Sequence, residues 1–162
     1  MRRAKKALGQ HTQATAHRYE HDPLGYCRNV LYGVPWQRQI EILEKLQEPP
    51  YKVLVRSGHN VGKSWLGAAT VAWSHECRQG RTIVTAPTKD TLKDIVFAEL
   101  RKMRPHLPGL APSDTRAWVS AGHTLLGYTA SKGEAFAGRH ARAVRVAPHE
   151  LARNITIGDE QQ

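Results

Sequence analysis

The residues whose types and spacing suit chemistry lie at positions 57–64, which read Ser-Gly-His-Asn-Val-Gly-Lys-Ser. The last three residues match the end of the phosphate-loop pattern, a glycine and four residues followed by Gly-Lys-Ser/Thr. Glycine lets backbone N–H groups surround phosphate oxygens, lysine supplies charge for the β- and γ-phosphates, and serine binds Mg²⁺. The pattern predicts a site for ATP and Mg²⁺; the alternative is a Gly-rich turn. The predicted ligand-binding residues are Ser57, Gly58, His59, Asn60, Val61, Gly62, Lys63 and Ser64, with Ser64 as the Mg²⁺ ligand.

The segments on either side have the pattern that such a loop needs. Residues 53–55 are apolar and β-branched, as in a buried strand, and the Ala-rich residues 62–78 predict a helix. A second buried strand is predicted at 82–85 and a second helix at 88–103. This alternation predicts an α/β fold of the P-loop NTPase type, with a mainly parallel sheet flanked by helices on both faces.

Further elements are predicted before and after this central unit. Asp22 and Pro23 predict a helix start, with Asp22 as the N-cap. A helix from Pro35 to residue 48 carries apolar residues on one face and ends at Pro49. Short strands are predicted downstream at 117–119, 124–129, 144–146 and 155–157.

The composition is that of one compact domain, with 162 residues of which 40% are hydrophobic. We assign residues 1–21 to a basic, flexible arm and residues 22–162 to the domain. The net charge of +10 favours contact with nucleic acid or an anionic surface, although a solvated basic surface would have the same charge. No apolar run is long enough to span a membrane, and Cys27 and Cys77 lie in no metal-binding pattern. We therefore expect a cytoplasmic protein.

Residues near the loop resemble a known family. Trp36-Gln37-Arg38-Gln39-Ile40, followed by residues 53–64, looks like the N-terminal ATPase of phage terminase large subunits. The first loop position is commonly not glycine in that family, so Ser57 fits. The resemblance covers roughly residues 20–150 and stops before the nuclease domain with which full-length members continue. It implies an incomplete, truncated ATPase domain.

The resemblance also implies roles for single residues. Gln37 would recognise adenine, for which its amide has both a donor and an acceptor. Arg56 or His59 would supply the charge that senses the γ-phosphate. The alternatives are a solvated helix residue for Gln37 and a structural cation at the strand end for Arg56.

Hydrolysis of ATP also requires acidic residues at the end of a neighbouring strand, where Asp holds Mg²⁺ and Glu polarises water. The family has this pair soon after a Gly-x-His element, which residues 138–140 match, and that spacing selects Glu150. However, His149 stands where the Asp is expected. The alternative is Asp159-Glu160, with Asp159 as a further Mg²⁺ ligand. If neither serves, the chain binds ATP without hydrolysing it well.

The function implied by the resemblance is the ATPase part of a DNA-packaging motor, which couples hydrolysis to translocation of double-stranded DNA into a prohead. A small terminase subunit and a portal protein would be partners, and the full-length form would assemble as a homo-oligomeric ring. One alternative is a superfamily-2 helicase-like ATPase, because residues 86–92 resemble a helicase DNA-contact motif. Another is a non-catalytic DNA-binding remnant, which the charge and the incomplete acidic motif favour.

Overall fold

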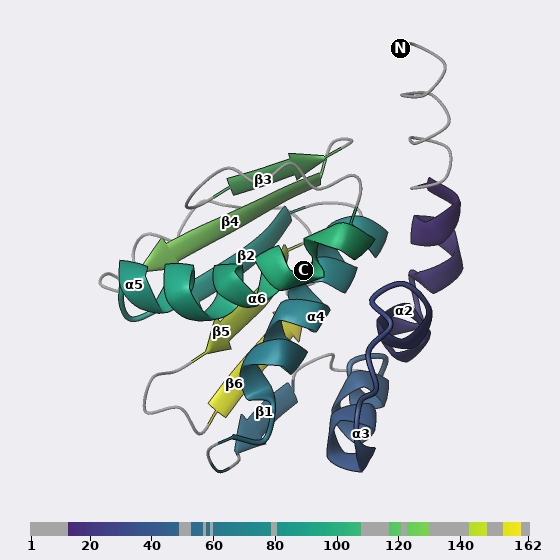
Figure 1. The fold of residues 1–162 in the computed structure, drawn as a ribbon, viewed down its shortest axis with the longest axis horizontal. Helices are drawn as coiled ribbons and strands as arrows, with labels where there is room; N and C mark the ends of the chain where they lie inside the picture. Colours follow the sequence, from purple (N-terminus) through teal and green to yellow (C-terminus); the bar gives the residue numbers. More distant parts are fainter. Residues whose placement is uncertain are drawn as a thin grey trace.

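The computed structural model describes most of the chain up to residue 107 and four strands beyond it. The described residues are 13–48, 53–56, 58, 60–78, 81–107, 117–120, 123–129, 143–148 and 154–159. Helices and strands alternate along this part of the chain, so the molecule is a mixed α/β protein (Figure 1).

A six-stranded sheet forms one layer of the molecule, in the order β1-β6-β5-β2-β4-β3. The strands are β1 (Val53–Arg56), β2 (Arg81–Ala86), β3 (Ala117–Ser120), β4 (His123–Thr129), β5 (Ala143–Pro148) and β6 (Asn154–Asp159). All six strands agree with the segments predicted from the sequence.

Strand direction in the sheet is mixed. β2 pairs in parallel with β4 and with β5, whereas β1–β6, β5–β6 and β3–β4 are antiparallel. Because β6 is antiparallel to both of its neighbours, β1 runs in the same direction as β5, β2 and β4. Four strands therefore run in the same direction, as predicted for a mainly parallel sheet. However, β6 lies between β1 and the three mutually parallel strands β5, β2 and β4.

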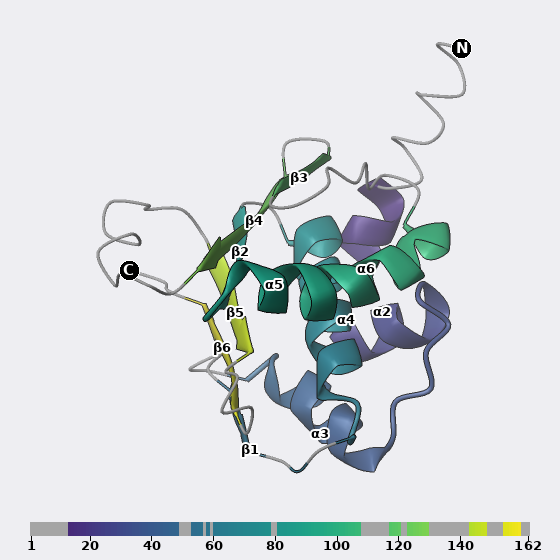
Figure 2. The same cartoon turned by 60° about the vertical axis from the view of Figure 1, so that its left-hand side comes forward.

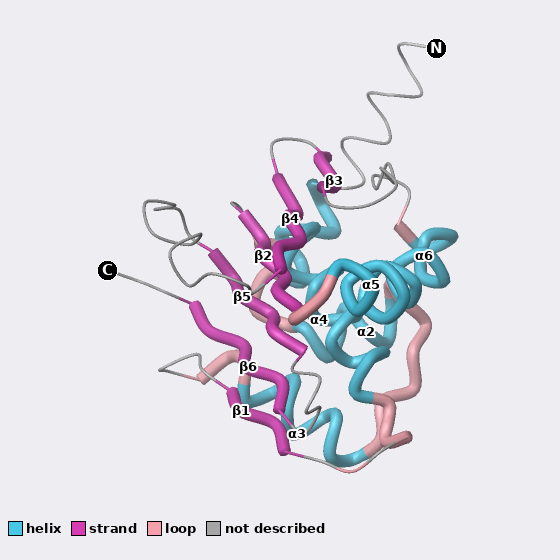
Figure 3. Tube along the Cα trace, turned by 90° about the vertical axis from the view of Figure 1, so that its left-hand side faces the viewer, coloured by secondary structure: helices cyan, strands magenta, loops and turns pink. Residues whose placement is uncertain are grey.

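The helices of the described residues lie on one face of the sheet (Figures 2 and 3). They are the helical residues 13–19, α2 (Pro23–Asn29), α3 (Gln37–Lys45), α4 (Lys63–Cys77), α5 (Lys89–Thr91), the π-turn η1 (Leu92–Val96), α6 (Phe97–Met103) and the 3₁₀-turn η2 (Arg104–His106). The prediction of helices on both faces is not met by the described part of the chain. The predicted burial of the first strand is met on one side only, because Leu54 is 65% exposed whereas Val55 is buried.

Part of the predicted N-terminal arm belongs to the domain. Residues 13–19 are helical, and the side chain of Tyr19 is buried. The indole N–H of Trp73 donates a hydrogen bond of 2.7 Å to the carbonyl of Tyr19 inside the core. The boundary at residue 21 was therefore wrong for residues 13–19, while residues 1–12 lie outside the described part.

Helix α4 forms the centre of the core. Every residue from Leu66 to Cys77 is buried, and the helix packs on β2, β4 and β5 as well as on α2 and α6. A helix buried on all sides must have small or apolar residues around its circumference, which the Ala-rich sequence provides. Its buried Glu76 accepts a hydrogen bond of 2.8 Å from the hydroxyl of Tyr26, which anchors the C-terminal end of α4 to α2.

The two cysteines belong to the same packed region. Cys27 of α2 and Cys77 of α4 are both buried free thiols. Burial raises the pKa of Cys27 to about 12 and raises that of Cys77 still further. A buried, protonated thiol behaves as a small apolar side chain, so these cysteines serve packing.

The helix predicted at 88–103 is interrupted by a π-turn. The N–H of Phe97 donates to the carbonyl of Leu92, five residues earlier, and the additional residue rotates the buried face. The apolar spacing of residues 88–103 predicts a single buried face of Leu92, Ile95, Val96, Leu100 and Met103. In the structure Ile95 is 37% exposed, whereas Phe97 is 1% exposed. Four of the predicted positions are buried as expected: Leu92, Val96, Leu100 and Met103.

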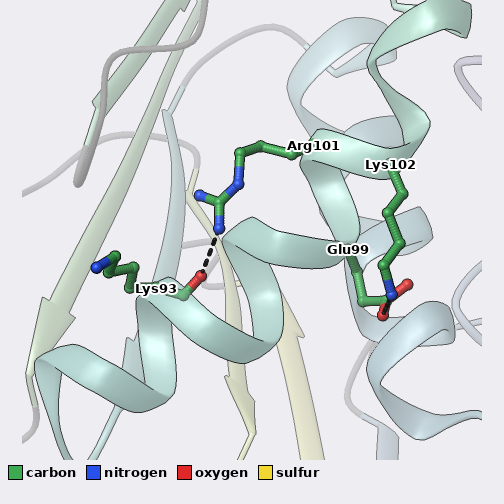
Figure 4. A network of polar contacts seen from close by, with 4 residues as sticks. All are labelled: Lys93, Glu99, Arg101 and Lys102. Atoms are coloured by element: carbon green, nitrogen blue, oxygen red, sulfur yellow. Dashed lines mark hydrogen bonds and ion pairs between the residues drawn. The ribbon is translucent and has the colours of Figure 1, made fainter.

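A polar side chain supports this π-turn. The guanidinium of Arg101 donates a hydrogen bond of 3.1 Å to the carbonyl of Lys93 (Figure 4). One turn away, Lys102 forms an ion pair with Glu99 on α6. The π-turn is thus held by a hydrogen bond from outside its own backbone.

Candidate phosphate-binding site

The segment predicted to bind phosphate joins β1 to α4. β1 ends at Arg56 and α4 begins at Lys63. Since β2, β4 and β5 run in the same direction as β1, the carboxyl ends of all four strands lie at the same edge of the sheet. Ligands of α/β proteins bind outside this edge. Ser57 and His59 lie outside the described residues.

The described part of the loop has the backbone of a tight turn. Asn60 and Gly62 both lie in the left-handed region, with φ of 57° and 77°. Gly62 is the N-cap of α4, and no side chain caps this helix. Gly62 thus has no side chain with which to accept the first N–H groups of this 15-residue helix, at the end where the helix dipole is positive. An anion is the natural partner for such a helix end.

Two predicted ligand-binding side chains stand in the first turn of α4. Lys63 is partly buried, and its amine donates a hydrogen bond to the carbonyl of Gly58 across the loop. Ser64 follows Lys63 in the sequence, and its side chain is exposed. The sequence therefore brings a cation and a hydroxyl to the uncapped helix end, as a Mg²⁺-nucleotide would require.

A cavity of about 460 Å³ opens beside the loop, between α3, β1 and the start of α4. Its lining includes the side chains of Arg56 and Lys63 and the apolar residues Ile42, Val53 and Leu66. A volume of this size is in the range of small-molecule sites. The cavity lining therefore combines basic side chains with apolar surface, and it also includes the acidic Glu41.

The predicted adenine ligand does not line this cavity. Gln37 is the first residue of α3 and is exposed, whereas Gln39, two residues later, is 7% exposed and lines the cavity. The amide of Gln39 donates to the carbonyls of Val61 and Gly62, at 3.5 and 3.4 Å. The alternative that Gln37 is a solvated helix residue agrees with this position.

Gln39 and the indole of Trp36 contact the loop, and neither was predicted as a site residue. Trp36 donates from its indole N–H to the carbonyl of Val61 at 3.3 Å, and its backbone N–H donates to the side chain of Gln39 at 3.2 Å. Glutamine three residues after an N-cap is a known capping signal. That signal predicts the bond within α3, but nothing local predicts the contact with the loop.

The two acidic alternatives differ in their place relative to the loop. Asn154, at the start of β6, is paired with Arg56 at the loop edge of the sheet. Asp159 lies five residues further along β6, beside the first half of β5, and so about 16 Å from that edge. This position argues against Asp159 as a ligand of Mg²⁺ at the loop, because β6 runs opposite to β1. Glu160 lies outside the described residues.

The other alternative follows a strand of the required direction. β5 ends at Pro148, at the same edge as the loop. Glu150 and His149 lie outside the described residues. β5 is not the immediate neighbour of β1, since β6 lies between them.

Among the described residues, no group of three or more His, Cys, Asp or Glu side chains is placed to hold a metal ion. No helix in this part of the chain is long and apolar enough to cross a membrane. No model of a protein family, no curated protein and no solved structure matches the chain.

Proposed function

We propose that this chain is the ATP-binding domain of a DNA-translocating ATPase of the terminase type. One observation carries the proposal: α4 begins at the glycine N-cap Gly62, and Lys63 in its first turn lines a cavity of about 460 Å³. Helix N–H groups would bind the phosphates together with Lys63. Ser64 would hold Mg²⁺, which neutralises phosphate charge when bound. The cavity would take the rest of the nucleotide.

The binding experiment is a titration with a fluorescent ATP analogue in the presence of Mg²⁺. Lys63→Ala removes the cation at the helix end, and we expect the affinity to fall at least tenfold, or about 1.5 kcal/mol. Lys93→Ala removes an equally charged but exposed side chain from η1 and serves as the control. Equal affinity of the wild type and Lys63→Ala would refute nucleotide binding at this loop.

Hydrolysis in this proposal depends on Glu150. β5 leads toward the loop edge of the sheet, whereas β6 leads away from it. We therefore expect Glu150→Gln to abolish ATP turnover while ATP still binds, and Glu160→Gln to have little effect. Turnover should be measured with DNA present. Wild-type turnover no faster than that of Lys63→Ala would favour a non-catalytic remnant instead.

Double-stranded DNA is the proposed partner, and the net charge of +10 supports it. Binding through phosphate contacts should weaken steeply as salt rises, because counterions are released, and should be nearly independent of sequence. Titration of two unrelated duplexes at several salt concentrations tests both points. A shallow salt dependence, or a strong preference for one duplex, would count against this partner. Packaging into a prohead, with a small subunit, a portal and a ring assembly, is the wider role that the proposal implies.

A further inference from the structure

The start of α3 is tied to the phosphate loop by side-chain hydrogen bonds. Gln39 donates to the carbonyls of Val61 and Gly62, and the indole of Trp36 also donates to Val61. Gln39 is itself fixed, since its oxygen accepts the backbone N–H of Trp36 at 3.2 Å. These contacts connect positions separated by 22 to 25 residues, so they arise only from the fold.

These bonds help to set which way the loop amides point, together with the N–H of Leu66, which donates to the carbonyl of Gly62 at 3.0 Å. In a trans peptide the C=O and N–H groups point in opposite directions. When the carbonyls of Val61 and Gly62 are directed at α3, the N–H groups of Gly62 and Lys63 point away from it. The amides that a bound phosphate would need are thereby oriented before any ligand arrives.

The contact between Gln39 and the loop also depends on the small size of residue 62. A Cβ at this position would lie 2.6 Å from the amide nitrogen of Gln39, and φ is +77°. A side chain at residue 62 would therefore push the amide of Gln39 out of its present position. The side chain of Gln39 is 7% exposed, so solvent does not compete strongly for its amide.

We infer that Gln39 and Trp36 are positioning residues that hold the phosphate loop in its binding shape. The inference rests on the proposed function, because the orientation of the amides matters for catalysis only if the loop takes a phosphate. Neither residue needs to touch the nucleotide for this role. Their loss should free the loop backbone and weaken the binding of the triphosphate.

Two variants test the role. Gln39→Glu keeps the size of the side chain and the acceptor for the N–H of Trp36, but places oxygen where an N–H₂ faced two carbonyls. Trp36→Phe keeps an aromatic ring and removes only the indole donor. The control is Gln13→Glu, the same chemical change at an exposed helical residue.

The first measurement is amide hydrogen exchange at Leu66 in the protein without nucleotide, because the N–H of Leu66 donates to the carbonyl of Gly62 at 3.0 Å and is exposed to exchange only when this carbonyl moves. We expect exchange about tenfold faster in Gln39→Glu and about two- to threefold faster in Trp36→Phe, with no change in the control. This readout does not depend on ATP binding. If Gln39→Glu fails to fold, Trp36→Phe decides, and unchanged exchange in that variant overturns the inference.

The second measurement is the affinity for the ATP analogue, relative to the wild type at the same pH. At about pH 8 we expect Gln39→Glu to bind about tenfold more weakly. At about pH 5 the introduced carboxyl gains a proton that it can donate to the carbonyls, so the deficit should shrink. A side chain that only supports folding would leave the same deficit at both pH values, and that result would overturn the inference.

Failure of the proposed function is recognised separately. If Lys63→Ala binds as well as the wild type, the site is not a nucleotide site, whereas faster exchange in Gln39→Glu would still support the contact with the loop. If Lys63→Ala loses binding while Gln39→Glu and Trp36→Phe match the wild type in affinity and exchange, the positioning role is wrong and the proposed function stands.

Discussion

Two strand–loop–helix units of this chain differ in how the N-terminus of their helix is capped. Between β2 and α5 the connection consists of Pro87 and Thr88, and the hydroxyl of Thr88 accepts the N–H of Thr91 at 3.1 Å. Between β1 and α4 the connection is longer, and the N-cap Gly62 has no side chain to offer. One helix end is thus capped by its own side chain, and the other begins at a glycine that has none.

The difference separates a structural turn from a candidate site. A helix end that needs no ligand satisfies its N–H groups with a side chain, as Asp22 also does for α2 by accepting the N–H of Gly25 at 2.7 Å. At α4 the neighbouring side chains of Trp36 and Gln39 bind the loop carbonyls instead of the N–H groups. We propose that the N–H groups at this helix end serve a partner from outside the chain, and the following substitutions test that proposal.

The largest effect is expected for Gly62→Ala. A residue with Cβ is strained at φ of +77°, at a cost of about 1 to 2 kcal/mol, and its Cβ would also displace Gln39. We expect the free energy of unfolding to fall by about 2 kcal/mol and ATP binding to weaken strongly. Gly58→Ala is the matched control for stability, because nothing lies within 4 Å of its added Cβ. Urea unfolding of both variants gives the comparison, and equal losses would contradict it.

Next in size is the effect of Tyr26→Phe at the buried end of α4. The substitution removes one hydrogen-bond donor from the buried Glu76 and leaves the aromatic ring in place. We expect a loss of about 1 to 2 kcal/mol in the free energy of unfolding. Affinity for ATP below the unfolding transition should stay close to that of the wild type. An affinity loss as large as that of Gly62→Ala would mean that the two ends of α4 are not independent.

A smaller effect is expected for Thr88→Ala at the capped helix end. Loss of an N-cap side chain costs about 1 kcal/mol of stability. Because this helix end is proposed to bind no phosphate, ATP affinity should remain unchanged. The free energy of unfolding and the ATP titration should be measured on the same preparation. Weaker nucleotide binding in Thr88→Ala would remove the distinction between the two units.

The smallest effect is expected for Gln37→Ala. Gln37 is exposed and does not line the cavity, so we expect ATP affinity to change by less than about twofold. Competition by GTP should be measured in parallel. A marked loss of preference for ATP over GTP would restore the adenine-binding role that the family resemblance implies for Gln37. It would also assign the two glutamines of α3 separate roles.

The sequence determined much of the local structure by itself. The apolar, β-branched run at 53–55, the N-cap Asp22 and the strand pattern at 124–129 predicted elements that the structure contains. Such signals work because helix caps and periodicity depend on residues a few positions apart. The π-turn was not predicted, because apolar spacing alone does not reveal one additional residue in the turn between Leu92 and Phe97.

Only the tertiary structure decided the relations between distant segments. The sequence at β6 suits an acidic strand end, but its antiparallel pairing with β1 carries Asp159 away from the loop. Trp36 and Gln39 reach the loop only because α3 packs beside β1. Strand direction and helix docking depend on the free energy of the whole core and on contacts far apart in sequence. Local residue types and spacing do not specify strand direction or helix docking. The loop could therefore be predicted from the sequence, but its contacts with Trp36 and Gln39 could not.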